Sequence, residues 1–327
     1  MDTRRLETLL TRFPALTLLV VGDYFLDHYL EIDSALAEMS LETGLEVHQV
    51  VRVRSTPGAA GTVTSNLRAL GAQVVALGVI GDDGNGYELK RALAATGVDV
   101  APLVESRERF TPTYTKPLRD GRELNRIDIK NRAPLPREIE DAVIARLRDL
   151  MPRVNGTIVV DQVQEQNCGV ITDRVREEIA ALSRERIVVV ESRERIGLFR
   201  GVIAQANARE ARRATGLEQI EACGAELFRR NRRPAIITIG AEGIRLFDAS
   251  GSTRIPAVSV RGPIDTVGAG DSLVAGFTAA LCAGASPREA GEIGNLVASV
   301  TIRQIGTTGT ATPAQVLAAA REVENRQ

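Results

Sequence analysis

The chain has 327 residues, and its 41 Lys and Arg residues nearly balance its 42 Asp and Glu residues, which gives a formal net charge of -1. This balance excludes a protein that binds nucleic acid through a general basic surface, because such a protein carries a clear excess of positive charge. With 44% hydrophobic residues but no Trp and 3% aromatic residues, the core is expected to consist of Ala, Val, Leu and Ile, as in parallel sheets covered by helices.

The few cysteines and histidines exclude several kinds of site. Three cysteines that lie far apart indicate neither a disulfide framework nor a thiolate metal site, so a reducing compartment is expected. His28 and His48 are the only histidines, and a three-histidine zinc site is therefore impossible. The apolar stretch from Phe13 to Val21 is too short to span a bilayer, and no cleavage pattern follows it, so we expect a cytoplasmic protein without membrane contact.

The first predicted element is a strand over Leu16 to Val21, whose unbroken apolar run suits burial on both faces. Residues Glu46 to Arg54 mix valines with polar residues, which predicts a strand with one wet face. Val74 to Ile80 predicts another buried strand, followed by a turn and a helix over Tyr87 to Ala95. The stretch 113–130 contains the turn signal Asp120-Gly121 and predicts a hairpin.

After Pro136, helices and strands alternate regularly, which predicts a doubly wound, mainly parallel sheet in an α/β fold. The stretches near 33–56 and 110–130 are expected to form a small second sheet, which would be a lid over an active site within a single domain covering 1–327. Helices are predicted over about 137–150, 171–183, parts of 208–230, 271–283, 287–304 and 313–323, and strands over 157–160, 187–190, 202–206 and 235–239, with 244–248 as an antiparallel partner of the last.

A glycine-rich turn directly before a predicted helix is the most informative motif. Residues 264–272 read Ile-Asp-Thr-Val-Gly-Ala-Gly-Asp-Ser, and Gly268 and Gly270 free the backbone to turn sharply. The start of a helix presents unpaired amides and the positive end of the helix dipole, so this turn is a candidate anion site. Asp271, in the first helical turn, would either complement the dipole or act as a general base beside bound phosphates. The motif alone leaves both roles open.

Together with the Ser-Leu-Val-Ala-Gly-Phe that follows Asp271, this turn resembles the second signature of the PfkB carbohydrate kinases, which have a ribokinase-like fold. Within that family, residues 39–47 and 124–128 are similar to the heptose 7-phosphate kinases. Other blocks that resemble the family occur in the right order along nearly the whole chain: Gly22-Asp23 through Asp27, Pro57 to Gly61, Gly78 to Gly86, Asn207-x-x-Glu210, and Thr238-Ile239-Gly240-x-x-Gly243.

The resemblance implies an ATP- and Mg²⁺-dependent kinase of a sugar or sugar phosphate, with Asp271 as catalytic base. It also implies that Gly268, Ala269 and Gly270 donate amides to the charge that develops on the transferred group. Asn207 and Glu210 would orient waters on the Mg²⁺ carried by ATP, although their spacing is equally that of a helix capping box.

For the acceptor end, the resemblance assigns Asp27 to sugar hydroxyls, with a helix cap or a surface acid as the alternative. Lys116 and Arg126 would hold a sugar phosphate, or would simply be solvated surface residues. Gly58 belongs to the first signature, but Ala59 replaces a second glycine and Thr62 replaces an asparagine of the family. Since Thr62 offers a single hydroxyl, its contact with the substrate must differ from that of the family.

For the nucleotide end, the resemblance implies that Thr238, Gly240 and Gly243 shape a loop against ATP, although a plain β-turn also explains the glycines. Asn295 corresponds to the family's adenine pocket, whereas a polar residue on a helix is usually exposed. The sequence does not decide whether a monovalent cation near Asp265 assists the reaction.

Two other functions stay open. A nucleoside kinase of the same fold is one, and a non-catalytic protein that senses sugar or nucleotide is the other. The expected partners are a small-molecule acceptor and ATP, with neither nucleic acid nor membrane. The resemblance also implies a homodimer through the lid sheets, although the charged stretch from Arg52 to Arg54 would oppose pairing of strand edges.

Overall fold

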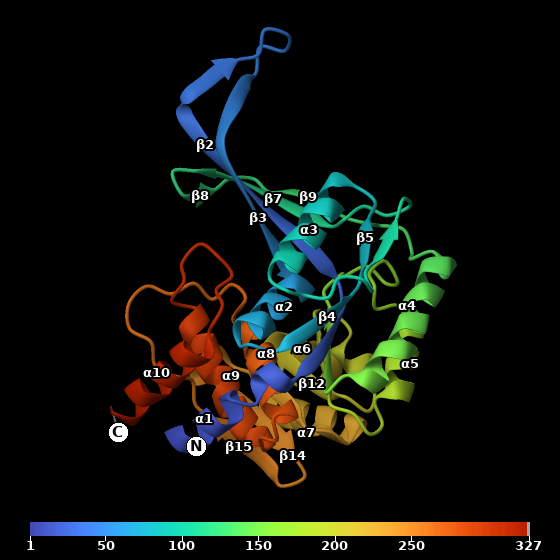
Figure 1. Ribbon diagram of the computed structural model, residues 1–327, viewed down its shortest axis with the longest axis vertical. Helices are drawn as coiled ribbons and strands as arrows, with labels where there is room; N and C mark the ends of the chain where they lie inside the picture. The colour runs from blue at the N-terminus through green and yellow to red at the C-terminus, as the bar shows by residue number, and fades with distance from the viewer. Residues whose placement is uncertain (326–327) are drawn as a thin grey trace.

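The computed structural model describes residues 1–325 and contains a large sheet, a smaller sheet and helices on both faces of the large one (Figure 1). The large sheet is parallel except at β14 and β15, so the predicted doubly wound sheet and its antiparallel partner over 244–248 are confirmed. Its strands in spatial order are β15 (Gly251–Ile255), β14 (Ile244–Asp248), β13 (Ala235–Thr238), β12 (Ile203–Asn207), β11 (Val188–Ser192), β10 (Gly156–Asp161), β1 (Thr17–Gly22) and β4 (Gln73–Leu77).

Alternate residues of the central strands enter two separate hydrophobic cores. In β1, Leu18 and Val20 belong to one core, and Leu19 and Val21 belong to the other. This arrangement explains why the strand is an unbroken apolar run, because neither face meets water. The first core is covered by α1 (Thr3–Leu10), α2 (Ala60–Ala69), α3 (Gly84–Ala95), α8 (Ala269–Cys282), α9 (Pro287–Thr301) and α10 (Pro313–Glu324), and the second by α4 (Arg137–Leu150), α5 (Asp173–Leu182), α6 (Ala208–Thr215) and α7 (Ile220–Asn231).

The predicted second sheet is present, and it begins earlier than expected. Its order is β3 (Glu46–Ala59), β2 (Tyr24–Met39), β7 (Thr113–Arg119) and β8 (Arg122–Glu123), and β9 (Ile127–Ile129) also pairs with β7. The first residues of β2 are buried, so their sequence has the pattern of a core strand. Solvent-exposed residues begin only beyond Ile32. Asp27 consequently lies inside this strand, not in a loop after β1. The far ends of β2 and β3 form an arm that projects well beyond the rest of the molecule (Figure 1).

The single strand expected over Val74 to Ile80 is wrong, because the chain divides at Gly78. β4 ends at Leu77, and β5 (Val79–Gly81) leaves the large sheet to pair with β6 (Val104–Ser106). A Cβ at position 78 would lie 2.6 Å from Cδ2 of Tyr24, so this glycine lets the chain pass the buried tyrosine ring closely.

The turn predicted at Asp120-Gly121 is confirmed. Both residues have a left-handed backbone, with φ of 51° and 74°, as a tight hairpin turn requires. Within residues 1–325, no helix has the length and apolar character needed to cross a bilayer.

Candidate active site

A cavity of about 530 Å³ lies where the carboxyl ends of the large sheet's strands meet the start of α8 and the base of the second sheet. Ligands of open α/β sheets bind at this edge. Most of the sequence-predicted site residues line it: Asp27, Gly58, Thr62, Lys116, Arg126, Asn207, Glu210, Thr238, Gly268, Gly270 and Asp271. Segments that are more than 240 positions apart in the sequence therefore meet in one cavity.

The start of α8 offers unpaired amides to the cavity. Gly268 is the N-cap and has φ of 77°, which a glycine adopts without strain. The amide of Ala269 already donates to the Thr266 carbonyl at 3.2 Å. Among the described residues, the amides of Gly268, Gly270 and Asp271 have no protein acceptor. Three free N–H groups at the positive end of a helix are suited to bind an anion.

Asp271 is paired with Glu191, a buried residue near the end of β11 that sequence reasoning missed. Their carboxyls share a hydrogen bond, and the side-chain amide of Gln162 donates to Glu191 Oε1 at 3.4 Å. Burial raises the pKa of Asp271 to about 6, although the Glu191 hydrogen bond and the charge of Arg193 oppose this rise. Burial and the neighbouring Asp271 charge raise the pKa of Glu191 well above its usual value. Their contact raises the pKa of Glu191 and lowers that of Asp271, so Glu191 is the proton donor of the pair. Asp271, with its pKa of about 6, is ionised at neutral pH.

Asp27 forms an ion pair across two strands of the second sheet. Lys116 Nζ lies 2.8 Å from Asp27 Oδ1 and 3.3 Å from the Tyr29 hydroxyl. Burial alone would lower the pKa of Lys116, but the contacts with Asp27 and Tyr29 raise it above its ordinary value. A Cβ at Gly58 would come within 2.8 Å of Asp27 Oδ2, so the glycine provides the space for this carboxylate. Asp27 is therefore neither a helix cap nor a surface acid.

Arg126 is held in a fixed position at the second-sheet side of the cavity. Its Nε and Nη2 donate to the two Asp128 carboxylate oxygens at 2.6 and 2.9 Å, and its guanidinium lies 4.3 Å from the centre of the Tyr114 ring. Thr62 is buried on α2 and lies next to the start of α8. A Cβ placed on Gly268 would be 3.4 Å from the methyl carbon of Thr62.

Asn207 and Glu210 form a complete capping box at the start of α6. The Glu210 amide donates to Asn207 Oδ1, and the Asn207 amide donates to Glu210 Oε2, each at 2.9 Å. Both residues also line the cavity. Asn207 and Glu210 therefore cap α6, as their spacing predicts, and they also line the cavity.

The oxygen donors on this wall fit a magnesium ion that arrives with ATP. Mg²⁺ prefers oxygen ligands, keeps several waters and takes one or two carboxylates when phosphates supply the rest. Glu210 and Asn207 offer a carboxylate and an amide oxygen of this kind. Within residues 1–325, no three His, Cys, Asp or Glu side chains gather into a metal cluster.

Four predicted residues lie outside the lining of this cavity: Ala269, Gly240, Gly243 and Asn295. Gly240 and Gly243 have φ of 56° and 95°, and the amide of Gly243 donates to the Gly240 carbonyl at 3.1 Å, so they form the turn between β13 and β14. Asn295 is buried on α9, not exposed, and donates to the carbonyls of Ile255 and Pro256 at 3.3 and 2.9 Å.

Asp265 ties together two loops beside α8. Its carboxylate accepts from the amide of Val267 at 3.0 Å and from that of Gly306 at 3.1 Å. These contacts hold the turn that precedes α8 against the loop after α9.

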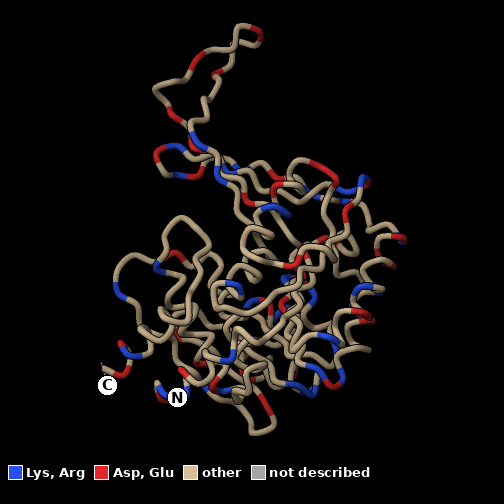
Figure 2. The backbone as a smooth tube through the Cα atoms, viewed as in Figure 1, with Lys and Arg blue, Asp and Glu red and all other residues tan. Residues whose placement is uncertain are grey.

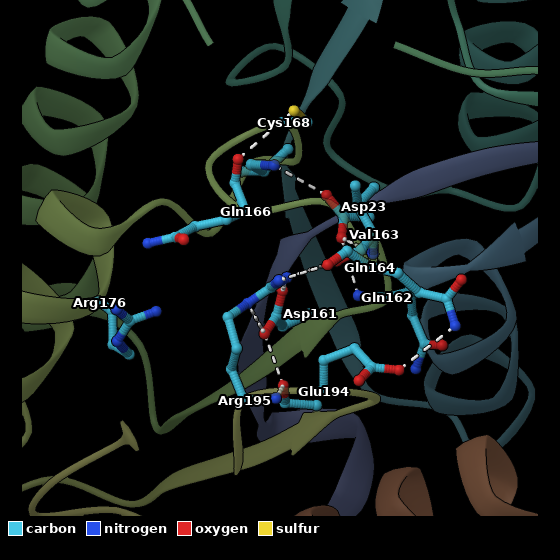
Figure 3. A network of polar contacts seen from close by, with 12 residues as sticks. Asp23, Asp161, Gln162, Val163, Gln164, Gln166, Cys168, Arg176, Glu194 and Arg195 are labelled. Carbon is cyan, nitrogen blue, oxygen red and sulfur yellow. Dashed lines mark hydrogen bonds and ion pairs between the residues drawn. The ribbon is translucent and has the colours of Figure 1, made fainter. Parts of the chain in front are cut away.

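A buried polar network that the sequence reasoning missed supports one wall of the cavity (Figure 3). Asp23 accepts from the amides of Gln162, Val163 and Val170 at 2.8 to 2.9 Å, and burial, with the nearby Asp161 charge, raises its pKa to about 6. Its neighbour Asp161 holds Arg195 at 2.6 Å. The polar residues at the carboxyl ends of β10, β11 and β12 interrupt otherwise apolar runs, and this pattern could have revealed them.

The chain matches the family model described as pfkB family carbohydrate kinase over residues 26–167 and 202–315. Relatives named bifunctional protein HldE are 32% identical to it in Trichlorobacter lovleyi and in Geotalea uraniireducens, over 98% and 97% of this chain. The chain spans about two thirds of the length of these curated relatives, 66% in both cases.

Solved kinases share the fold at low sequence identity. Arabidopsis thaliana ribokinase in complex with ribose and ATP has a TM-score of 0.70 and 18% identity, with 94% of this chain and 99% of that chain covered. Adenosine kinase from Sinorhizobium meliloti has a TM-score of 0.66 and 20% identity, with 94% and 99% covered. The predicted ribokinase-like fold is confirmed by these neighbours.

Proposed function

The chain belongs to the pfkB family of carbohydrate kinases, and from that premise we propose that it transfers the γ-phosphate of ATP to a hydroxyl of a sugar phosphate. The observation that carries the proposal is a single cavity that holds the ionised Asp271, the free amides at the start of α8 and the Asp27–Lys116 pair. A base, an anion site and polar groups for an acceptor are the parts that phosphoryl transfer needs, because the reaction depends mainly on positioning and charge stabilisation.

In the proposed reaction, Asp271 accepts the proton of the acceptor hydroxyl while the hydroxyl oxygen forms a bond to the γ-phosphorus. The bond from this phosphorus to the β,γ-bridging oxygen breaks, and ADP leaves with its electron pair. The amides of Gly268, Gly270 and Asp271 donate to the oxygens of the transferred group. The proton then passes from Asp271 to solvent.

We assign Glu210 and Asn207 to the magnesium ion that accompanies ATP, through water molecules. The ion, when bound, neutralises charge on the phosphates. Thr238, which lines the same cavity, and the Gly240–Gly243 turn belong to the nucleotide side of the site. We assign Asp271 and Asp27 to contacts with the acceptor.

The acceptor that we propose is a heptose 7-phosphate. The resemblance of residues 39–47 and 124–128 to the heptose 7-phosphate kinases supports it, and so does the similarity to the HldE relatives over 97% to 98% of this chain. Lys116 and Arg126, on the second-sheet side of the cavity, provide the positive charge for a phosphate on the acceptor. Asp27 would then accept hydrogen bonds from the sugar hydroxyls.

The second sheet would act as the lid of this site and as the contact between two copies of the chain. Eight large apolar side chains of the arm are exposed: Leu36, Met39, Leu41, Leu45, Val47, Val50, Val51 and Val53. A second copy would cover this surface. An ATP-dependent kinase of this kind would work in the cytoplasm.

A phosphotransfer screen tests the function directly. The panel contains sugars, sugar phosphates including heptose 7-phosphate, and nucleosides, each with ATP and Mg²⁺. We expect turnover with heptose 7-phosphate. The variant Asp271→Asn should lower kcat at least about 100-fold, as the loss of a general base does, and should still bind ATP.

Asp149→Asn is the matched control, because it makes the same chemical change on the surface of α4, where Asp149 pairs with Arg153. If only nucleosides were phosphorylated, the acceptor would be a nucleoside and not a sugar phosphate. Bound ATP without any turnover across the panel would instead indicate a sensor. Near wild-type turnover by Asp271→Asn would show that another group is the base.

A further inference from the structure

The cavity is lined by three cationic side chains, and one of them has no anionic partner. Lys116 is paired with Asp27 at 2.8 Å, and Arg126 is paired with Asp128 at 2.6 Å. Among residues 1–325, the guanidinium of Arg193 has no carboxylate within ion-pair distance. Lys116 and Arg126 share their charge with a carboxylate, whereas Arg193 presents its full charge to an anionic ligand in the cavity.

The backbone that carries Arg193 is held firmly on both sides. The Arg193 amide donates to the Asp161 carbonyl at 3.0 Å, and the Arg195 amide donates to Ser192 Oγ at 2.8 Å. The Arg195 guanidinium is itself bound to the buried Asp161 carboxylate at 2.6 Å, as Figure 3 shows. The network around Asp161 thus holds the loop after β11, and the exposed side chain of Arg193 extends from this held backbone.

Arg193 lies between the two halves of the site. It lines the cavity together with Tyr114 of the second sheet and with Asp271 and Glu210 of the large-sheet side, and its charge opposes the rise in the pKa of all three. The proposed reaction places the γ-phosphoryl group in this same interval, between an acceptor held by the second sheet and a nucleotide held beside α6.

We infer that Arg193 is a catalytic residue that binds the phosphoryl group during its transfer. The inference rests on the proposed function. The guanidinium donates N–H groups to the non-bridging oxygens of the group, while the acceptor oxygen bonds to phosphorus and ADP departs with the electrons of the broken bond. Its fork of donors stabilises the charge that the amides of α8 contact from the other side.

The test compares Arg193→Gln and Arg193→Lys with wild type in two measurements. In steady-state kinetics with ATP and heptose 7-phosphate, Arg193→Gln should lower kcat about 100- to 1,000-fold, as the loss of one transition-state donor does. The KM values should change less than about threefold. Arg193→Lys should restore part of kcat, because it keeps the charge but loses the fork.

The second measurement needs no turnover. Calorimetry follows ADP binding with Mg²⁺, with and without aluminium fluoride, which mimics the phosphoryl group in transfer. Aluminium fluoride should tighten ADP binding to wild type and not to Arg193→Gln, while ADP alone binds both equally. Arg184→Gln, in the exposed turn between α5 and β11 at the opposite end of the sheet, should behave as wild type in both measurements.

Two results would overturn the inference. One is an equal effect of aluminium fluoride on wild type and on Arg193→Gln, including no effect on either. The other is a raised acceptor KM with unchanged kcat, which would place Arg193 on the acceptor's own phosphate. A wild type that phosphorylates nothing but binds ADP and aluminium fluoride through Arg193 would instead contradict only the proposed acceptor.

Discussion

Asp271 lies among carboxyl groups that come from separate strands and helices. Glu191 shares a hydrogen bond with it, and Asp27 and Glu210 add negative charge nearby. Burial remains the largest cause of its raised pKa, and Arg193 limits the rise. The protonation of the base therefore depends on the whole lining of the cavity.

The first prediction concerns pH. The pKa of Asp271 is about 6 in the free protein, and the base works only when it is ionised. We expect kcat/KM to be constant above pH 7 and to fall about tenfold per pH unit well below pH 6. Initial rates at low substrate concentration from pH 4.5 to 8.5 would measure this profile. A kcat/KM that stays flat down to pH 5 would contradict the assignment.

Ala59 occupies a backbone conformation that a side chain disfavours. Its φ is 53° and its ψ is -117°, at the point where β3 passes into α2. Such a conformation costs a non-glycine residue about 1–3 kcal/mol. The adjacent pairing of Tyr24 with Ala59 and the start of α2 hold the residue in place.

The second prediction is that Ala59→Gly stabilises the fold. Glycine removes the strain but loses about 0.5–1 kcal/mol through the greater freedom of the unfolded chain, so the net gain should be about 1 kcal/mol. Urea unfolding measures the difference. Arg232→Gly is the control, since Arg232 lies in the ordinary left-handed basin, with φ of 54° and ψ of 26°. A larger gain for Arg232→Gly than for Ala59→Gly would refute strain at Ala59.

At the scale of elements, α6 begins with a pair that serves structure and faces the site. The capping box uses one Glu210 oxygen and one Asn207 oxygen, so the helix start and the assigned magnesium contact depend on the same side chains. The two roles can be separated because capping needs an acceptor oxygen, whereas magnesium binding gains from negative charge.

The third prediction is that Glu210→Gln separates these roles. Glutamine keeps an oxygen for the Asn207 amide, so the free energy of unfolding should change by less than about 0.5 kcal/mol. The Mg²⁺ concentration for half-maximal rate should rise at least about tenfold. Glu210→Ala should lose the cap as well, at about 1 kcal/mol. An unchanged Mg²⁺ titration in Glu210→Gln would remove Glu210 from the metal.

Elements with strong patterns were predictable, and close approaches between distant segments were not. The strands β12 and β13 follow from apolar runs, and the turn at Asp120-Gly121 follows from its turn residues. The break at Gly78 was not predictable, because it depends on the close approach of the Tyr24 ring, which lies far away in the sequence. Most of β3 was predicted from its mixture of valines and polar residues. The start of β2 was not, because its buried apolar residues have the pattern of a core strand of the large sheet.

The candidate site shows the same division. A family motif could identify Asp271 and Glu210, but it gave no sign of Glu191 or Arg193, because their importance comes from the cavity they share with residues on other elements. The Asp27–Lys116 pair also depends on the pairing of β2 with β7, which a single sequence does not specify.

At the scale of the whole molecule, the arm differs from the body in its surface. Charges of both signs alternate over the body, whereas the outer arm is mostly uncharged and carries acidic residues alone between positions 33 and 51 (Figure 2). Its edge strand β3 bears Arg52 and Arg54, which contact Glu31 and the Tyr29 ring. Since charged edges discourage edge pairing, two copies would meet through the faces of their arms.

The fourth prediction is that the arm holds a dimer together. Leu41→Asp combined with Leu45→Asp should convert a dimer into a monomer, because both side chains are exposed at the tip, at 103% and 69%. The monomer should still fold, because neither side chain belongs to the two hydrophobic cores of the described residues. Sedimentation velocity distinguishes the two states, and Leu198→Asp, exposed on the body, is the control. A wild type that sediments as a monomer would exclude the contact.

The tyrosines of the second sheet have a spectroscopic consequence. The chain has no Trp, and three of its four tyrosines, at positions 24, 29 and 114, lie on β2 and β7. Tyr29 contacts Lys116, and Tyr114 contacts Arg126. Without tryptophan to absorb their excitation energy, three of the four tyrosines report by their own emission on the sheet to which we assign the acceptor. Acceptor binding can therefore be followed by the protein's own fluorescence, without a label.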